Sequence, residues 1–159
     1  MYPKGDPRSA LATAKRDTSG TTATPASYGL YYRDDPVESD ANGRAWYTRG
    51  QDLLVNYIEA EPGATFSRTG QTDEYMIVLP DEDTPYSVTA KGETKEGPGH
   101  QVIIVPPGDS SITLPGGGRV VRLFSTQSDD LNAKCANAAT YAQPDPAIPP
   151  FKPWPDPPA

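Results

Sequence analysis

Short apolar runs separated by turns of proline and glycine are the feature that most constrains the fold of this chain. The runs cover residues 53–60, 75–79, 86–91, 101–105, 111–114 and 119–124, and a shorter one holds Trp46 and Tyr47. They are rich in β-branched and aromatic residues, as strands are. Their spacing of roughly 8–12 residues predicts a sandwich or barrel of short strands.

The composition favours the same class. The chain has 19 prolines and 14 glycines among 159 residues, and only 35% of its residues are hydrophobic. Such a content of turn-forming residues argues against a helical bundle, and the length fits one ordinary domain. The fold class predicted from the residues is therefore all-β.

The charge and the cysteine content of the chain indicate which kinds of partner it can bind and in which cellular compartment it is expected. The formal net charge is −7, and Lys and Arg are scattered rather than clustered on one segment, so nucleic acid is not expected as a partner. Neither a secretory signal nor a run of apolar residues long enough to span a membrane is recognisable. With Cys135 as the single cysteine, the chain has no internal disulfide, and we expect a soluble cytoplasmic protein.

The two ends of the chain differ from its centre. Residues 1–27 are rich in Thr, Ser, Ala, Gly and Pro without a hydrophobic period, which predicts a mobile arm. Residues 28–127 are expected to form the barrel, and 128–142 a helix that Ser128 or Asp129 would cap. The proline-rich segment 143–159 is expected to form an extended tail or linker. We expect its residues Phe151 and Trp154 to pack against the surface of the folded domain.

Two segments resemble the motifs of the cupin superfamily. The first runs from Glu61-Pro62-Gly63 through Thr69-Gly70-Gln71-Thr72-Asp73-Glu74 into the apolar run 75–79. The second is Gly99, a buried-type strand over 101–105, Pro106-Pro107-Gly108, and then Asp109-Ser110-Ser111. The resemblance covers about residues 46–124. It implies a double-stranded β-helix, or jelly-roll barrel, with one short C-terminal helix and extended termini.

The histidines that bind metal in cupins are missing from both motifs. On the cupin template, Thr69, Gln71 and Ser111 stand at the histidine positions and Glu74 at the acidic one; in a register anchored on Glu74, the first two become Arg68 and Gly70. Transition metals of the kind that cupins bind need several imidazole or carboxylate ligands. We therefore expect neither a metal nor any other cofactor.

The most polar cluster beside the predicted strands gives the candidate ligand-binding residues. These are Arg68, Gln71, Glu74 and Ser111, with Arg68 suited to hold a carboxylate or phosphate through its planar guanidinium. The alternative is that Arg68 and Glu74 form a structural ion pair that fills a vestigial site.

Three functions remain open from the sequence. The first is a metal-free, degenerate cupin that binds a small polar or anionic ligand, or serves as the non-catalytic half of a cupin assembly, as in two-domain cupins (bicupins). The second is a metal-independent isomerase, epimerase or lyase acting on a sugar-like or carboxylate substrate, with Glu74, His100 and Tyr57 as weak catalytic candidates. The third is a structural interaction module. The sequence leaves catalysis open but favours a non-catalytic role, and we expect a homodimer or association with a second cupin domain.

Overall fold

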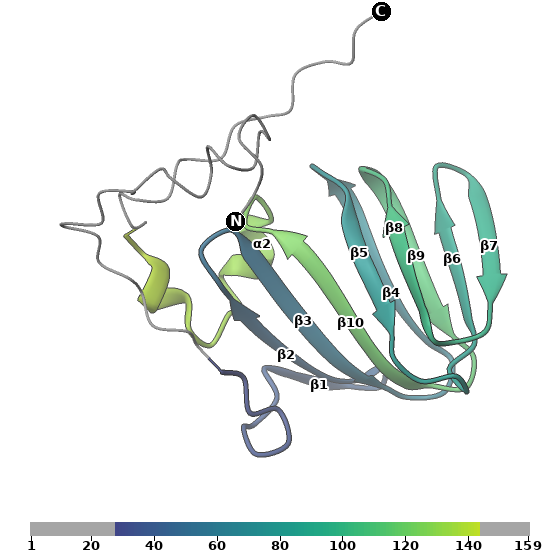
Figure 1. Ribbon diagram of the computed structural model, residues 1–159, viewed down its shortest axis with the longest axis horizontal. Helices are drawn as coiled ribbons and strands as arrows, with labels where there is room; N and C mark the ends of the chain where they lie inside the picture. The colour runs from purple at the N-terminus through teal and green to yellow at the C-terminus, as the bar shows by residue number, and fades with distance from the viewer. Residues whose placement is uncertain (1–27, 144–159) are drawn as a thin grey trace, which may run out of the picture.

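A computed structural model describes residues 28–143, and in this part of the chain ten strands form two antiparallel sheets (Figure 1). The predicted all-β jelly-roll class is confirmed. The six-stranded sheet has the order β1-β2-β3-β10-β5-β8, and the four-stranded sheet the order β4-β9-β6-β7. The strands are β1 (Glu38–Asp40), β2 (Gly43–Arg49), β3 (Leu53–Ala60), β4 (Ala64–Gln71), β5 (Tyr75–Leu79), β6 (Tyr86–Ala90), β7 (Glu93–Gly97), β8 (Gln101–Val105), β9 (Gly108–Leu114) and β10 (Gly118–Ser125).

The alternation of side chains along each strand places the core between the sheets. In β3, for example, Leu54 and Ile58 are fully buried, whereas Leu53 is about half exposed. Strands from both sheets contribute to the core, because successive side chains of a strand point to opposite faces. Its largest fully buried hydrophobic members are Phe124, Leu54, Ile58, Ile77, Leu79, Ile112, Leu114, Val105 and Val120.

Three strands lie outside the apolar runs of the sequence. These are β1, β4 and β7, of which β1 and β7 are edge strands composed largely of charged and polar residues. Edge strands with charged side chains are common, because charge discourages unwanted pairing with other chains. Such strands carry little of the hydrophobic pattern by which a strand is recognised.

A β-bulge interrupts β4 and re-aims its side chains. Arg68 pairs with Ser110 and Gln71 with Gly108, so two residues of β4 oppose one residue of β9. Gly70 lies in this bulge with a φ of 59°, in the left-handed region that glycine adopts without steric cost. The bulge shifts the alternation by one residue, so Arg68 and Gln71 both point into the barrel although they are three positions apart.

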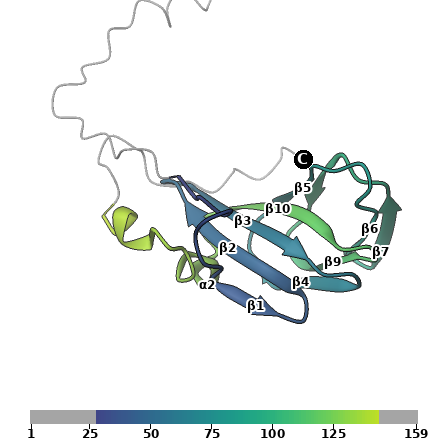
Figure 2. The same ribbon diagram turned by 90° about the horizontal axis from the view of Figure 1, so that it is seen from below.

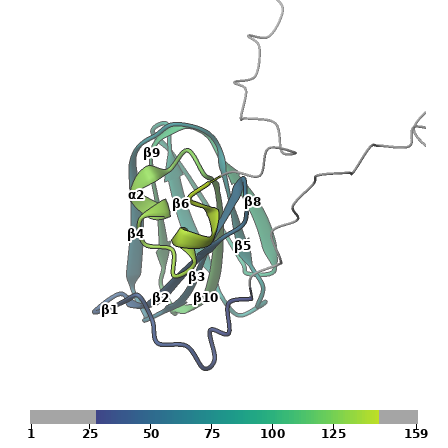
Figure 3. The ribbon, with the colours of Figure 1, turned by 90° about the vertical axis from the view of Figure 1, so that its left-hand side faces the viewer.

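Two short helical segments replace the single helix expected over residues 128–142. They are α2 (Asp129–Asn132) and the 3₁₀ helix η1 (Ala138–Tyr141), and Figure 3 shows both across one end of the barrel. Ser128 precedes α2, but its side chain makes no capping hydrogen bond and instead contacts Gln71. Leu131, Cys135 and Tyr141 are buried, so these segments close the barrel end by packing rather than by helical regularity.

The segment before β1 packs against the outer surface of β2 and β3 (Figure 2). The ring of Tyr31 stacks on that of Tyr57 at 4.9 Å between centroids, and Trp46 donates a hydrogen bond from Nε1 to the carbonyl oxygen of Asp34 at 2.8 Å. The expected mobile arm over 1–27 lies outside the described residues, as does most of the predicted tail with Phe151 and Trp154.

Candidate functional site

Two parts of the described barrel are candidate sites: the polar end covered by α2, and a largely apolar cleft between the free edges of the two sheets. At the covered end, Arg68 donates from Nε to Oε1 of Gln71 at 2.9 Å, and from Nη1 and Nη2 to Asp130 at 2.6 and 3.0 Å. Only 13% of the Arg68 side chain is exposed. The guanidinium therefore has its main donors engaged within the protein, in the bidentate geometry that makes such pairs strong.

Gln71 connects this pair to the start of α2. Its side chain is buried, and its Nε2 donates to Oδ1 of Asp73 at 2.9 Å and to Oγ of Ser128 at 3.0 Å. Hydrogen bonding to Arg68 holds the pKa of the Asp130 carboxyl below its usual range, although partial burial opposes this. The network links β4 to α2 and closes the barrel end.

The expected pair between Arg68 and Glu74 is wrong. Glu74 is exposed in the turn before β5, and Asp130, which lies 62 residues from Arg68 in sequence, takes its place. Ser111 also differs from expectation, because it alternates with the buried Ser110 and faces outward in the four-stranded sheet. Of the four expected ligand-binding residues, the structure brings together only Arg68 and Gln71.

The three weak catalytic candidates are not brought together. Tyr57 lies on the outer face of β3, where it stacks on Tyr31. In the antiparallel pair β5–β8, Tyr75 faces Val105 and Leu79 faces Gln101, so Glu74 and His100 lie beyond opposite ends of the pair. A strand rises about 3.4 Å per residue, which separates these two residues by far more than a hydrogen bond.

His100 lies on an exposed turn. It has a φ of 57°, and 72% of its side chain is exposed. Its Nδ1 is 3.8 Å from Oε1 of Glu82, which is itself exposed. This arrangement is that of a surface histidine at the rim, without a buried partner to orient it as a base.

Arg122 is the buried polar residue that the sequence reading missed. It is 4% exposed on the inner face of β10, donates from Nε to Oδ1 of Asn56 at 2.9 Å, and lies 5.5 Å from the ring centroids of both Phe66 and Phe124. Its Nη1 has no hydrogen-bond partner among the described residues. Burial lowers the pKa of Arg122, but an arginine keeps its proton in proteins, so the barrel holds an incompletely compensated cation.

The alternation of residues along the strand could have predicted that Arg122 points into the barrel. It stands between Val120 and Phe124 at a spacing of two in the predicted strand, and both of these are buried. An arginine in phase with two core residues points inward whatever its charge. Asn56 follows the same rule between Leu54 and Ile58.

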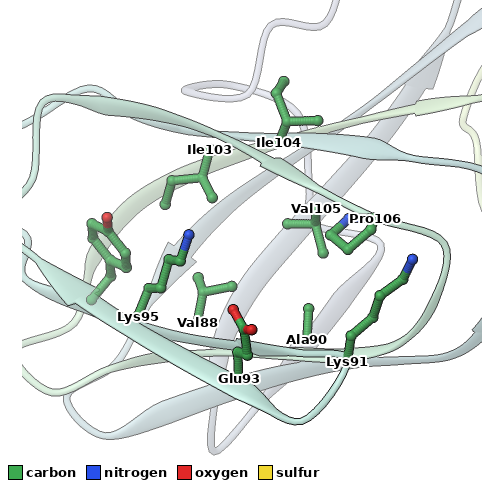
Figure 4. A pocket seen from close by; sticks show the side chains of 10 residues that line it. Val88, Ala90, Lys91, Glu93, Lys95, Ile103, Ile104, Val105 and Pro106 are labelled. Atoms are coloured by element: carbon green, nitrogen blue, oxygen red, sulfur yellow. The ribbon is translucent and has the colours of Figure 1, made fainter.

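The cleft lies between β7 and β8, where neither strand has a second neighbour (Figure 4). Its volume is about 270 Å³, and its walls are largely apolar. In Figure 4, the β6–β7 hairpin directs Lys95, Glu93 and Lys91 toward β8, while Ile103 and Val105 point inward and Ile104 points away. The complete lining is Tyr86, Val88, Ala90, Lys91, Glu93, Lys95, Ile103, Ile104, Val105 and Pro106.

Few side chains in the described part of the chain are placed to coordinate a metal ion. Within residues 28–143, no group of three or more His, Cys, Asp or Glu side chains lies together in a way that could hold a metal ion. At the covered end of the barrel, the inward-facing groups are those of Arg68, Gln71, Tyr75 and Ser110, and Tyr75 and Ser110 share a hydrogen bond of 3.0 Å. A cationic guanidinium beside neutral amide and hydroxyl groups does not suit a transition metal. Among the described helices, none is both long and apolar enough to cross a membrane.

Comparison by sequence finds no relative: no family model matches the chain, and no curated protein is similar to it. Comparison by structure does. An RmlC-like cupin from Shewanella frigidimarina NCIMB 400 superposes with a TM-score of 0.56 at 16% identity, covering 67% of this chain and 96% of that one. KdgF from Halomonas sp. gives a TM-score of 0.55 at 14% identity, covering 67% and 98%.

A third structure agrees with these two. An RmlC-like cupin protein from Desulfovibrio desulfuricans gives a TM-score of 0.50 at 8% identity, over 64% of this chain and 97% of that one. Nearly the whole length of each of the three domains is matched, although few residues are shared. The domain described by residues 28–143 therefore has the cupin fold.

Proposed function

We propose that this domain is a metal-independent binding protein for a small amphipathic carboxylate, which it holds in the cleft between β7 and β8. The observation that carries the proposal is the combination of apolar walls with lysine side chains directed over them (Figure 4). Binding sites for small molecules are typically concave and apolar, with a few polar groups that fix the orientation of the ligand.

The charges at the cleft favour an anion. Lys91 and Lys95 form no ion pair with another described residue, and Glu93 is the one acidic side chain of the lining. The ammonium groups would contact the carboxylate, while Val88, Ile103 and Val105 would contact the apolar part of the ligand. Lysine suits this role, because its long stem packs along apolar surface while its charge reaches the rim.

The covered end of the barrel is a weaker candidate for the same ligand. Binding to Arg68 and Gln71 would require an anion to displace Asp130 from two hydrogen bonds. We therefore assign the Arg68 network a structural role, in which Asp130 rather than the expected Glu74 is the acidic partner.

Titration calorimetry with octanoate would test the proposal. We expect octanoate to bind and octylamine, which has a similar chain and the opposite charge, not to bind. The double variant Lys91→Met/Lys95→Met should weaken octanoate binding by about tenfold, since exposed charge contacts contribute up to about 1 kcal/mol each. Lys134→Met is the matched control, because Lys134 pairs with Glu38 away from the cleft.

Two results would contradict the proposal. Equal binding of octanoate and octylamine would indicate adsorption on apolar surface, and unchanged octanoate binding in the double variant would exclude the cleft. Metal independence has its own measurement. Elemental analysis should find zinc, iron, manganese and nickel each far below one ion per chain, and a stoichiometric metal would contradict it.

A further inference from the structure

A small pocket lies beside β2, between the segment that precedes β1 and the turn that joins α2 to η1. Its volume is about 140 Å³, which is enough for the head group of a small ligand. Most of its lining residues carry an aromatic ring or a carboxylate, namely Tyr28, Tyr31, Trp46, Tyr47, Asp34 and Asp35. The pocket therefore offers ring surface and negative charge to a ligand.

Two of these rings are held in place by hydrogen bonds. The Tyr31 hydroxyl shares a hydrogen bond of 2.6 Å with the hydroxyl of Thr48, and Trp46 donates its ring N–H to the carbonyl oxygen of Asp34. The polar atoms of both side chains are engaged within the protein, so they present ring surface rather than hydrogen bonds to a ligand. A site whose rings are fixed beforehand loses little side-chain freedom on binding.

The charges that line the pocket are negative. Asp34 and Asp35 are exposed at its rim, and no Lys, Arg or His is among the described residues of the lining. Arg33 approaches Asp34 only to 3.8 Å, and Asp35 forms no ion pair with another described residue. Two carboxylates are too few oxygen ligands for a metal ion, and the described residues add no third acidic, His or Cys donor. The ligand that fits this lining is an organic cation.

Rings of this pocket already attract cations of the protein itself. The Arg44 guanidinium lies 5.7 Å from the ring centroid of Trp46, and the Lys134 ammonium lies 5.4 Å from that of Tyr47. Both of these cations are paired with glutamates, and neither lines the pocket. A cation over an aromatic face is attracted by the negative π surface of the ring, most strongly for Trp. The same attraction is available to a cation that enters the pocket.

We infer that this pocket binds an alkylated ammonium group, such as the trimethylammonium head of choline. The methyl groups on the nitrogen pack against the rings, while the carboxylates of Asp34 and Asp35 balance the charge. A primary ammonium, such as that of octylamine, is a compact and strongly hydrated charge, so it should bind here much more weakly. The inference goes beyond the carboxylate site in the cleft, and either one can fail without the other.

NMR titration of the full chain with choline would test the inference. We expect the N-methyl protons of choline to shift upfield, because they lie over aromatic rings, and the amide signals of residues 28–37, 46–48 and 136–137 to change. The matched control ligand is 3,3-dimethylbutan-1-ol, which has the shape of choline without its charge and should not bind. An amide of N-acetyl-trimethyllysine is titrated in parallel. The tighter of the two cations shows whether the ammonium group belongs to a free small molecule or to a peptide side chain.

Two variants assign the binding to this pocket. Tyr28→Leu removes a ring and Asp35→Asn removes a charge, and each should weaken choline binding at least about fivefold. Tyr32→Leu is the matched control, because Tyr32 is 86% exposed, as Tyr28 is at 83%, but does not line the pocket. Circular dichroism establishes that the variants are folded, and octanoate binding should stay unchanged in all three.

Three results would overturn the inference. They are the absence of choline binding, equal binding of choline and the neutral alcohol, and unchanged choline binding in either Tyr28→Leu or Asp35→Asn. A loss of octanoate binding to the cleft with choline binding retained would count against the proposed function alone.

Discussion

The outward faces of the two sheets differ in composition although both belong to one barrel. The six-stranded sheet presents valine, leucine, isoleucine and methionine, whereas the four-stranded sheet presents serine and threonine. In the latter, Thr65 faces Thr113 and Ser67 faces Ser111, and the hydroxyl groups of Thr65 and Thr113 lie 2.9 Å apart. The four-stranded sheet has the pattern of a solvated surface, whereas the six-stranded sheet turns apolar side chains outward.

The inner faces do not show this contrast. Arg122 and Asn56 lie among apolar residues on the inner side of the six-stranded sheet, and the inner side of the four-stranded sheet carries Arg68, Gln71 and Ser110 beside Val88, Ile112 and Leu114. The six-stranded sheet is thus apolar outside and partly polar inside. The apolar content of one face of a strand therefore does not show whether that face belongs to the core. The core face is identified by which alternate residues line up with residues known to be buried.

The largest expected effect comes from breaking the polar pair inside the six-stranded sheet. Asn56→Leu removes the acceptor of Arg122 Nε and leaves the buried guanidinium without this hydrogen bond, so the free energy of unfolding should fall by about 2–3 kcal/mol. Urea denaturation measures it. Ser110→Ala is the comparison on the other sheet. It removes a neutral hydrogen bond to Tyr75 and should cost about 1 kcal/mol.

The double variant Asn56→Leu/Arg122→Met sharpens this test. Replacing both partners with apolar side chains removes the buried charge, so most of the stability lost in Asn56→Leu should return. If Asn56→Leu alone cost no more than Ser110→Ala, the inner faces of the two sheets would be energetically alike.

A smaller effect, dependent on pH, is expected where the four-stranded sheet is tied to α2. The Arg68 guanidinium depresses the pKa of Asp130 in the folded state, so the pair stabilises the fold fully above the unfolded-state pKa of about 4. That contribution is lost as the pH falls through the folded-state pKa. Asp130→Asn should thus lower the melting temperature at neutral pH and have progressively less effect toward acid pH.

The control for this measurement is Asp129→Asn, the neighbouring carboxylate at the start of α2, which makes no ion pair with a described residue. The effect of Asp129→Asn on the melting temperature should depend less on pH than the effect of Asp130→Asn. A difference between wild type and Asp130→Asn that stays constant down to strongly acid pH would contradict the assignment of Arg68 as its partner.

The smallest effect is expected on the outer face of the four-stranded sheet. Thr113→Val replaces a hydroxyl on a solvated surface with a methyl group of similar size, and the free energy of unfolding should change by no more than about 0.5 kcal/mol. Chemical denaturation of this variant beside wild type measures the change. A loss of several kcal/mol would mean that the hydroxyl rows are structural and that this face is not simply solvated.

The spacing of the apolar runs predicted the fold, because it shows where strands and turns lie along the chain. Both are determined by residues that are close together in the sequence. The runs at 53–60, 75–79 and 101–105 coincide with β3, β5 and β8. The site was harder to predict, because its contacts are not local. Asp130 meets Arg68 across 62 residues, and no pattern in the sequence connects an exposed helix residue to a strand in the barrel.

The misplacement of Ser111 has a different cause. Matching the motif by counting residues put Ser111 at an inward position, but the alternation in β9 turns Ser110 inward and Ser111 outward. The alternation of 110, 112 and 114 as one face was available in the sequence. The register of β4 was not, since a bulge is visible only through its partner strand.

The bulge at Gly70 changes which residues of β4 point into the barrel. It therefore determines at which positions metal-binding side chains would have to be introduced. In an uninterrupted strand, two ligands separated by one residue would point the same way. Here, the inward positions on either side of the bulge in β4 are 68 and 71, with 110 on the neighbouring strand. Imidazoles grafted at 69 and 71 would diverge, one into solvent and one into the barrel, whereas imidazoles at 68, 71 and 110 would converge. Deleting Gly70 would restore the simple spacing and with it the alternation that a motif search assumes.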